Sequence, residues 1–207
     1  MKRILCYGDS NTWGYIPGSG ERYDEETRWP MLLQKRLGAP YRVIEEGLNG
    51  RTTVLNDPLE PGRNGLDYLG PCLQSHAPLD LVVVMLGTND LKRRFSLTAE
   101  EIAQGMERLI RTMELSEAGP GSRKPDILLL APPVLERVPV WSYAFLGMEE
   151  KSKQLGKAYQ ELAGRRGCSF LNAGRHVAAG GADGVHLTEE EHRRIAELVV
   201  SKVREIV

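Results

Sequence analysis

The stretch LDLVVVMLG, residues 79–87, is the most informative about the fold of this chain. Every position from 81 to 86 is apolar. A strand with one face in water alternates apolar and polar side chains, and this run does not alternate. It therefore predicts a strand in the middle of a parallel sheet that helices cover on both faces.

Outward from this strand, short apolar runs alternate with longer helical patterns. The central strand is expected at residues 81–86, and four more strands at 3–6, 42–45, 127–131 and 169–171. Helical patterns occupy residues 27–38, 64–77, 98–115, 149–167 and 187–207. This alternation is typical of parallel strands joined by crossover helices. We therefore expect an α/β fold, a three-layer α/β/α sandwich around a five-stranded parallel sheet.

The last helical pattern has the clearest start signal. Thr188 is followed three residues later by Glu191, the spacing of a capping box. An apolar stripe with a 3.6-residue period follows, which predicts a helix with one buried face. The stripe consists of Ile195, Leu198, Val199, the stem of Lys202, Val203 and Ile206.

Acidic and basic side chains nearly balance along the 207 residues. Lysine and arginine number 27 against 28 aspartates and glutamates, for a formal net charge of −1. Without a positive field the chain has nothing to hold a polyanion, which argues against nucleic acid as a partner. The length suits one hydrophobic core, so we expect a single domain over residues 1–207.

Three cysteines, Cys6, Cys72 and Cys168, lie far apart with no CxxC or Cys/His ligand spacing. This usage favours free thiols in a reducing compartment and neither disulfides nor a metal site. The opening MKRILCYG has too short an apolar run for a signal peptide, and LVVVML is too short to span a bilayer. We expect a soluble, cytoplasmic protein without a membrane partner.

Polar blocks follow the predicted strands. They are GDSN at 8–11, GLNG at 47–50, GTND at 87–90 and, before the last helix, DGVH at 183–186. The carboxyl ends of parallel strands meet at one edge of a sheet, so these blocks should lie together. A serine, a side-chain amide, a glycine and an Asp/His pair are the components of nucleophilic acyl transfer.

Each residue type suits one role in that chemistry. The hydroxyl of Ser10 needs a base to become a nucleophile, and the neutral imidazole of His186 is suited to take its proton. Asp183 lies three residues before His186 and is placed to orient the ring. The side chain of Asn89 and the backbone N–H groups of Gly50 and Ser10 would receive the developing oxyanion.

Each block alone has a second interpretation. Ser10 suits a helix N-cap, GTND suits an ordinary turn, and an isolated Asp-x-x-His pair is often surface polarity. His76, His176 and His192 have no partner pattern, and we expect them at the surface or at helix ends. The succession of blocks at successive strand ends is what favours a site.

The blocks GDSN, GLNG, GTND and DGVH resemble, in order and approximate spacing, the signature of the SGNH (GDSL-type) hydrolases, named for Ser, Gly, Asn and His. The resemblance spans the whole chain, and VIEEGLNGRTT, LDLVVVMLGTND and DGVHLT are similar to the bacterial arylesterase and acyltransferase branch. It implies a flavodoxin-like sandwich without metal or organic cofactor. It also implies a catalytic triad of Ser10, Asp183 and His186, with oxyanion donors from Ser10, Gly50 and Asn89.

The chain departs from the family pattern at Asn11, where the commoner block is GDSL. Asn11 sets a polar group beside the nucleophile and is expected to shape the acyl side of the pocket. Asp9 is expected to support the nucleophile turn. Trp13 and Arg51 are expected either to line the pocket or to pack in the core or at the rim. The candidates for substrate contact are Asn11, Trp13, Trp141, Phe145 and Val185.

Two stretches, residues 16–26 and 132–147, do not fit the alternation of strands and helices and are expected to form the rim of the site. The segment 134–147 carries Trp141, Tyr143 and Phe145 among prolines and glycines. Exposed aromatic residues of this kind mark a ligand groove or a subunit contact. In the similar arylesterases the corresponding insertion serves both roles, so we expect a homo-oligomer whose neighbours narrow the entrance of the site.

The leading expectation is a serine esterase that acts on small or short-chain acyl esters through an acyl-enzyme, with acyl transfer to other acceptors as a further activity. A carbohydrate deacetylase is the alternative within enzymes. A flavodoxin-like binding module is a third possibility, but Asp9 places a carboxylate where a bound phosphate would sit.

Overall fold

The computed structural model describes residues 1–207. Seven strands form, namely β1 (Lys2–Gly8), β2 (Tyr41–Gly47), β3 (Leu81–Met85), β4 (Asp126–Ala131), β5 (Val134–Leu135), β6 (Ser169–Asn172) and β7 (Ala178–Ala179). The α-helices are α1 (Ser10–Trp13), α2 (Trp29–Leu37), α3 (Gly65–His76), α4 (Ala99–Glu114), α5 (Glu149–Arg166) and α6 (Glu189–Ile206). Four short 3-10 turns are η1 (Asn89–Leu91), η2 (Arg93–Phe95), η3 (Tyr143–Phe145) and η4 (Ala173–Arg175).

The main sheet has five strands in the order β2-β1-β3-β4-β6, and all its neighbours pair in parallel. The uniformly apolar strand β3 lies in the middle, and all five of its residues are buried. This confirms the inference from residues 81–86, because only a strand covered on both faces can be apolar throughout.

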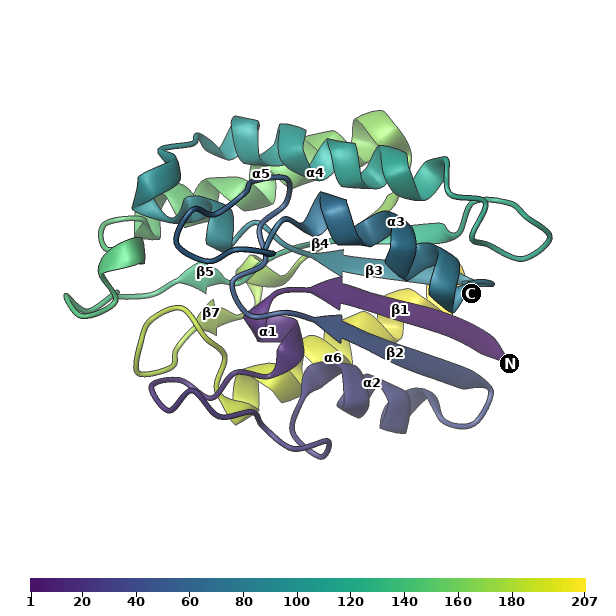
Figure 1. The fold of residues 1–207 in the computed structure, drawn as a ribbon. Helices are drawn as coiled ribbons and strands as arrows, with labels where there is room; N and C mark the ends of the chain where they lie inside the picture. The colour runs from purple at the N-terminus through teal and green to yellow at the C-terminus, as the bar shows by residue number, and fades with distance from the viewer.

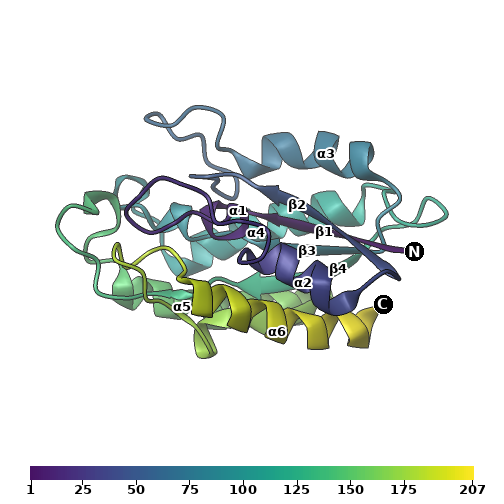
Figure 2. The ribbon, with the colours of Figure 1, turned by 90° about the horizontal axis from the view of Figure 1, so that it is seen from below.

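Helices cover both faces of the sheet, as Figures 1 and 2 show. Helices α3, α4 and α5 pack on one face around a core of 29 buried residues. Helices α2 and α6 pack on the other face around a second core of 19 buried residues. Alternate residues of each strand enter alternate cores: Tyr7 faces α3 to α5, and Cys6 faces α2 and α6. The expected three-layer α/β/α sandwich is therefore confirmed.

The strand order reverses between β1 and β3, because the chain leaves β1 toward β2 on one side and later returns to form β3 on the other. In such sheets ligands bind in the crevice at the carboxyl ends of the strands, where the order switches. Both chain termini lie at the opposite end of the sheet (Figure 1), and Lys2 and Val207 line one shallow cavity there.

The predicted elements agree with the structure to within a few residues at their ends. The two-stranded parallel pair β5 and β7 was not predicted. On α6, Glu191 accepts hydrogen bonds from the backbone N–H and the hydroxyl of Thr188, so the expected cap is present. Leu198 of the predicted stripe is only half-buried, and α6 instead buries Ala196. No helix is long and apolar enough to cross a membrane.

Candidate active site

Ser10 lies at a tight turn between β1 and α1. The strand ends at Gly8, where a Cβ atom would meet the Thr12 hydroxyl oxygen at 2.0 Å and the Met85 carbonyl at 2.9 Å. Asp9 caps α1 by accepting a hydrogen bond from the Asn11 backbone N–H at 2.9 Å. Ser10 is therefore the first helical residue, and only 5% of its surface is exposed.

The structure brings Ser10, His186 and Asp183 into one hydrogen-bonded chain. The Ser10 hydroxyl oxygen lies 2.9 Å from Nε2 of His186. The other ring nitrogen, Nδ1, lies 2.7 Å from Oδ2 of Asp183. The second carboxylate oxygen accepts hydrogen bonds from the backbone N–H groups of Val185 and His186, both at 2.9 Å. The carboxylate therefore fixes both the imidazole and the loop that carries it.

Asp183 is ionised at neutral pH. Burial opposes ionisation, but the hydrogen bonds from the His186 ring and from the backbone of His186 and Val185 outweigh it and lower the pKa to about 2. A carboxylate that remains charged holds the proton of His186 on Nδ1 and leaves Nε2 free to act as a base toward Ser10.

Asn11 holds the loop of His186 against the turn of Ser10. Its side-chain amide donates to the Val185 carbonyl at 3.2 Å, and its side-chain oxygen accepts from the Leu187 backbone N–H at 3.1 Å. Both polar ends of Asn11 are thus used within the protein, and Asn11 is not among the residues that line the groove described below. The family-atypical residue at this position joins two parts of the site that lie 176 residues apart.

Gly50 and Asn89 follow β2 and β3, the strands on either side of β1. Gly50 has φ = 78°, a conformation that side chains disfavour. The amide of Asn89 donates one hydrogen bond to the Arg51 carbonyl at 3.1 Å, which leaves its second N–H free. The backbone N–H groups of Ser10 and Gly50 donate to no other backbone group. These three donors come from three adjacent strand ends and have capacity to bind a further acceptor.

Two further acids lie buried beneath the site. Burial raises the pKa of Asp9 to about 6, although the Asn11 N–H bond and the neighbouring His186 act in the other direction. Burial also raises the pKa of Asp90 to about 6, against hydrogen bonds from the hydroxyl and backbone of Thr53. Asp9 thus supports the turn of Ser10, as the sequence suggested, and burial makes its charge unfavourable.

An open groove of about 300 Å³ leads to His186. Side chains from three segments line it, and Asp183 and His186 form its polar end. The lining comprises Tyr15, Trp141, Ser142, Tyr143, Ala144, Phe145, Asp183, Val185 and His186. The ring of Tyr15 lies 4.2 Å from that of His186, centre to centre. The guanidinium of Arg93 lies 4.9 Å from the Tyr143 ring centre and supports it from η2.

Of the five candidates for substrate contact, Trp141, Phe145 and Val185 line this groove, and Asn11 and Trp13 do not. The backbone carbonyl of Trp13 accepts a hydrogen bond from Arg22, whose guanidinium also lies over the indole. Sequence reasoning missed Tyr15. It lies five residues after Ser10 in GDSNTWGY, and the left-handed turn at Gly14 returns it to the site.

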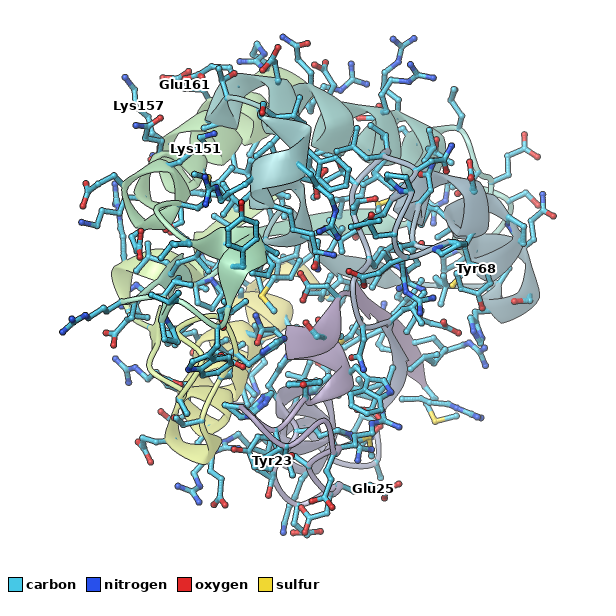
Figure 3. All side chains as sticks on the ribbon, turned by 60° about the vertical axis from the view of Figure 1, so that its left-hand side comes forward. Tyr23, Glu25, Tyr68, Lys151, Lys157 and Glu161 are labelled. Carbon is cyan, nitrogen blue, oxygen red and sulfur yellow. The ribbon has the colours of Figure 1, made fainter.

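Arg51 packs behind the site and does not line the groove. It is buried, donates to the carbonyls of Gly8 and Glu46, and lies over the rings of Tyr7 and Tyr68 at 4.3 and 5.4 Å. Figure 3 labels Tyr68 on α3, on the opposite side of the view from Lys157 and Glu161 of α5. Arg51 therefore joins the end of β1 to the face of α3.

Of the three histidines other than His186, His76 ends α3, as expected, and only the burial of His192 departs from expectation. His192 is fully buried, its Nδ1 accepts from the Trp29 backbone N–H at 3.3 Å, and burial lowers its pKa to about 3. His76 pairs with Glu46 at 2.8 Å. His176 is exposed, as expected.

One group of side chains could hold a metal ion. Atoms of Glu46, Cys72 and His76 all lie within 4.8 Å of one another. No Cys/His ligand spacing was expected from the sequence, yet Cys72 and His76 lie four residues apart on one face of α3. The third member comes from β2, so sequence spacing could not reveal the group. All three cysteines are free, and Cys168 is half-buried.

The chain is similar to known proteins of one family. Residues 6–194 match the model of the GDSL-like lipase/acylhydrolase family. The native aryl esterase of M. smegmatis is 40% identical, with a TM-score of 0.96 and full coverage of both chains. A carbohydrate acetylesterase from Sinorhizobium meliloti is 41% identical, with a TM-score of 0.95 and full coverage of both chains.

A curated relative is more distant and longer. The acetylxylan esterase of Xylanibacter ruminicola is 26% identical over 98% of this chain, and the match spans 43% of that protein. The chain therefore spans less than half the length of the curated relative that it matches.

Proposed function

This chain belongs to the GDSL-like lipase/acylhydrolase family and is an esterase, and we propose that it cleaves small, short-chain acyl esters through a covalent intermediate on Ser10. The single observation that carries the proposal is the unbroken chain from the Ser10 hydroxyl through His186 to Asp183, with contacts of 2.9 and 2.7 Å. A nucleophile, a base and an orienting carboxylate in this geometry are the parts of a serine hydrolase.

The acylation step follows from the positions of these groups. The Ser10 oxygen attacks the ester carbonyl carbon while its proton passes to Nε2 of His186, and the carbonyl electron pair moves onto oxygen. Asn89 and the backbone N–H groups of Gly50 and Ser10 donate to that oxyanion. The pair then returns and expels the alkoxide, which takes the proton from Nε2 and leaves as the alcohol. Asp183 stays ionised throughout and stabilises the imidazolium.

Deacylation repeats the same steps with water as the nucleophile. Nε2 of His186 removes a proton from water as the oxygen attacks the acyl carbon, and then returns it to the Ser10 oxygen as the acid leaves. An alcohol in place of water would yield a new ester, so acyl transfer competes with hydrolysis at this step. The open groove beside His186 is where such an acceptor would approach.

Labelling with a serine-directed phosphonate tests the proposal directly. Ser10 should be the residue modified when the labelled protein is digested and mapped, and ester hydrolysis should disappear in proportion to labelling. Modification of another serine with loss of activity would assign the nucleophile elsewhere.

Two classes of substrate are candidates, and the volume and lining of the groove are relevant to both. Its volume of about 300 Å³ lies at the small end of ligand pockets, which favours short acyl groups and small alcohols. Aryl esters suit its aromatic lining. Acetylated sugars are the second candidate, because the relatives include a carbohydrate acetylesterase and an acetylxylan esterase. The ratio of kcat/KM for phenyl acetate and for an acetylated xyloside separates them.

We also propose a homo-oligomer in which the segment 134–147 contributes to the contact between subunits. Trp141 and Tyr143 are 64% and 65% exposed, and Val140 is exposed beside them. Exposed apolar side chains gathered in one segment are typical of a ligand groove or a contact surface. A neighbour seated there would narrow the groove. The three unpaired cysteines support a reducing, cytoplasmic location.

A further inference from the structure

Four charged side chains form a closed network beside the site, which we call the Lys92 cluster: Asp57, Glu60, Lys92 and Arg94. Lys92 Nζ donates to Asp57 at 3.2 Å and to Glu60 at 2.7 Å. Arg94 donates to the same two carboxylates, to Asp57 at 3.0 Å from Nε and to Glu60 at 3.0 Å. Two cations therefore face two anions, and each cation contacts both anions.

Two side chains of this cluster are buried. The side chain of Lys92 is 4% exposed, and that of Asp57 is fully buried. Buried ions are retained only when they are paired, and breaking one pair leaves an uncompensated charge. Asp57 and Lys92 are therefore fixed in place more firmly than the partners of a surface ion pair.

The cluster joins two loops that carry different oxyanion donors. Lys92 belongs to the turn that begins at Asn89, and its backbone N–H donates to the Asn89 carbonyl at 3.3 Å. Asp57 and Glu60 belong to the loop that follows Gly50. A Cβ atom on Gly50 would lie 2.4 Å from the Glu60 carboxylate, so that carboxylate rests against the Gly50 backbone.

Two other contacts tie the same loops together on the buried side. Asp90 accepts hydrogen bonds from the backbone and hydroxyl of Thr53. The amide of Asn89 donates to the Arg51 carbonyl at 3.1 Å. The base of the loop after Gly50 is closed by further bonds, among them the Thr52 backbone N–H to the Arg63 carbonyl at 2.9 Å and the Asn64 amide to the Asn56 side-chain oxygen at 3.3 Å. The Lys92 cluster ties the outer stretch of the loop, which carries Asp57 and Glu60, to the turn that begins at Asn89.

We propose that Lys92 is a positioning residue for ester cleavage: through Asp57 and Glu60 it fixes the separation between the Gly50 N–H and the amide of Asn89. The inference rests on the proposed function, because it assumes that these two groups receive the oxyanion. The geometry of an oxyanion site acts on the transition state, so an error in spacing lowers kcat and leaves KM almost unchanged.

The test is to measure kcat and KM for Lys92→Met. The value of kcat is calculated per active site, counted by phosphonate titration, so that unfolded protein does not lower it. A misplacement on the scale of 1 Å should lower kcat by about 10- to 100-fold with KM constant. Lys92→Arg should keep more activity than Lys92→Met, since it restores the charge. If Lys92→Met fails to fold, Glu60→Gln replaces it, because the Glu60 side chain is 41% exposed and its loss is tolerable.

A double-mutant cycle distinguishes positioning from general damage. In the Asn89→Ala background one of the two donors is already lost, so Lys92→Met should cost several-fold less than it does in the native enzyme. Lys202→Met is the matched control, an ion-paired lysine at the far end of α6, and should leave kcat unchanged.

Full multiplicative losses in the cycle, or an unchanged kcat per titrated site in both Lys92→Met and Glu60→Gln, would overturn the proposal. A Ser10→Ala variant measured alongside separates the two hypotheses. If Ser10→Ala retained turnover, the proposed function itself would fail, whatever the Lys92 variants do.

Discussion

The turn of Ser10 and the segment 134–147 lie at the same end of the sheet but are built in opposite ways. Ser10 is almost fully buried, and its neighbours Asp9 and Asn11 are tied by hydrogen bonds to the turn and to the His186 loop. In the segment, Trp141 and Tyr143 present most of their surface to solvent. The residues proposed for chemistry are fixed by the fold, whereas Trp141, which is proposed for substrate contact, lies at its surface.

This difference divides the expected effects of mutation into two kinds. Changes at the buried turn should alter the rate for every substrate, because the groups there are the ones proposed to act on the reacting atoms. Changes in the segment should alter the preference among substrates and the contact between subunits. Variants of both kinds test this division.

The largest effect is expected at the triad. Ser10→Ala and His186→Ala should each lower kcat by on the order of 10⁴- to 10⁶-fold, and the double variant should be little worse, because triad members act as a unit. Steady-state hydrolysis of an aryl acetate measures all three. Ser201→Ala removes an exposed hydroxyl near the C-terminal end of α6 and serves as the control. Independent, multiplicative losses would argue against a triad.

The next effect concerns Asn89. Asn89→Ala should lower kcat by about 10²- to 10³-fold, or roughly 3 to 4 kcal/mol, through loss of one oxyanion donor. The lost hydrogen bond to the Arg51 carbonyl should cost only about 1 kcal/mol of folding free energy. Urea unfolding and active-site titration separate these quantities. A variant that unfolds readily but keeps full activity per folded molecule would make Asn89 structural.

The buried acid Asp9 should appear in the pH dependence of stability. Its folded pKa of about 6 lies above the ordinary value of 3.8, so between those values the folded chain binds a proton that the unfolded chain has released. This group therefore makes the protein more stable as the pH falls from about 6 to about 4, by up to roughly 3 kcal/mol. Asp9→Asn keeps a capping side chain and should remove that contribution.

Urea unfolding of Asp9→Asn and of the native protein at pH 4.5, 5.5 and 7 measures the difference. Asp67→Asn, which replaces an exposed aspartate on α3, is the control and should follow the native curve. If the free energies of unfolding of Asp9→Asn and of the native protein changed with pH in parallel, Asp9 would make no pH-dependent contribution to stability in this range.

The smallest effect is expected in the segment 134–147. Trp141→Ala combined with Phe145→Ala should widen the range of acyl lengths accepted and should weaken the oligomer at the same time. The ratio of kcat/KM for a longer and a shorter acyl ester should change by an amount equivalent to about 1 to 3 kcal/mol. Light scattering after size exclusion gives the assembly, and Leu115→Ala replaces an exposed apolar residue elsewhere. A native monomer at micromolar concentration would refute the oligomer. Unchanged acyl preference in a dissociated variant would leave the segment as an interface only.

The same division explains what the sequence could reveal. The central strand, the five-stranded sheet and the meeting of Ser10, Asp183 and His186 follow from local apolar patterns and from the rule that parallel strands end at one edge. The pair β5 and β7 was missed because strands of two residues have no period to read.

Residues whose place depends on distant partners were also missed. His192 is buried, and its ring accepts a hydrogen bond from the backbone of Trp29, 163 residues away. Tyr15 reaches the ring of His186 only through the turn at Gly14. Asn11 was expected in the pocket, but its amide is used by the backbone of residues 185 and 187. No pattern within one segment could report such contacts.

The two chain ends lie together at the end of the sheet opposite the groove (Figure 1). A bead, a carrier surface or a fused protein attached at either end would therefore stand behind the molecule, with about the length of a strand between it and the incoming ester. Immobilised in this way, the enzyme would present its groove outward. Attachment through exposed lysines of α5 such as Lys157 would instead orient the molecules sideways on the surface.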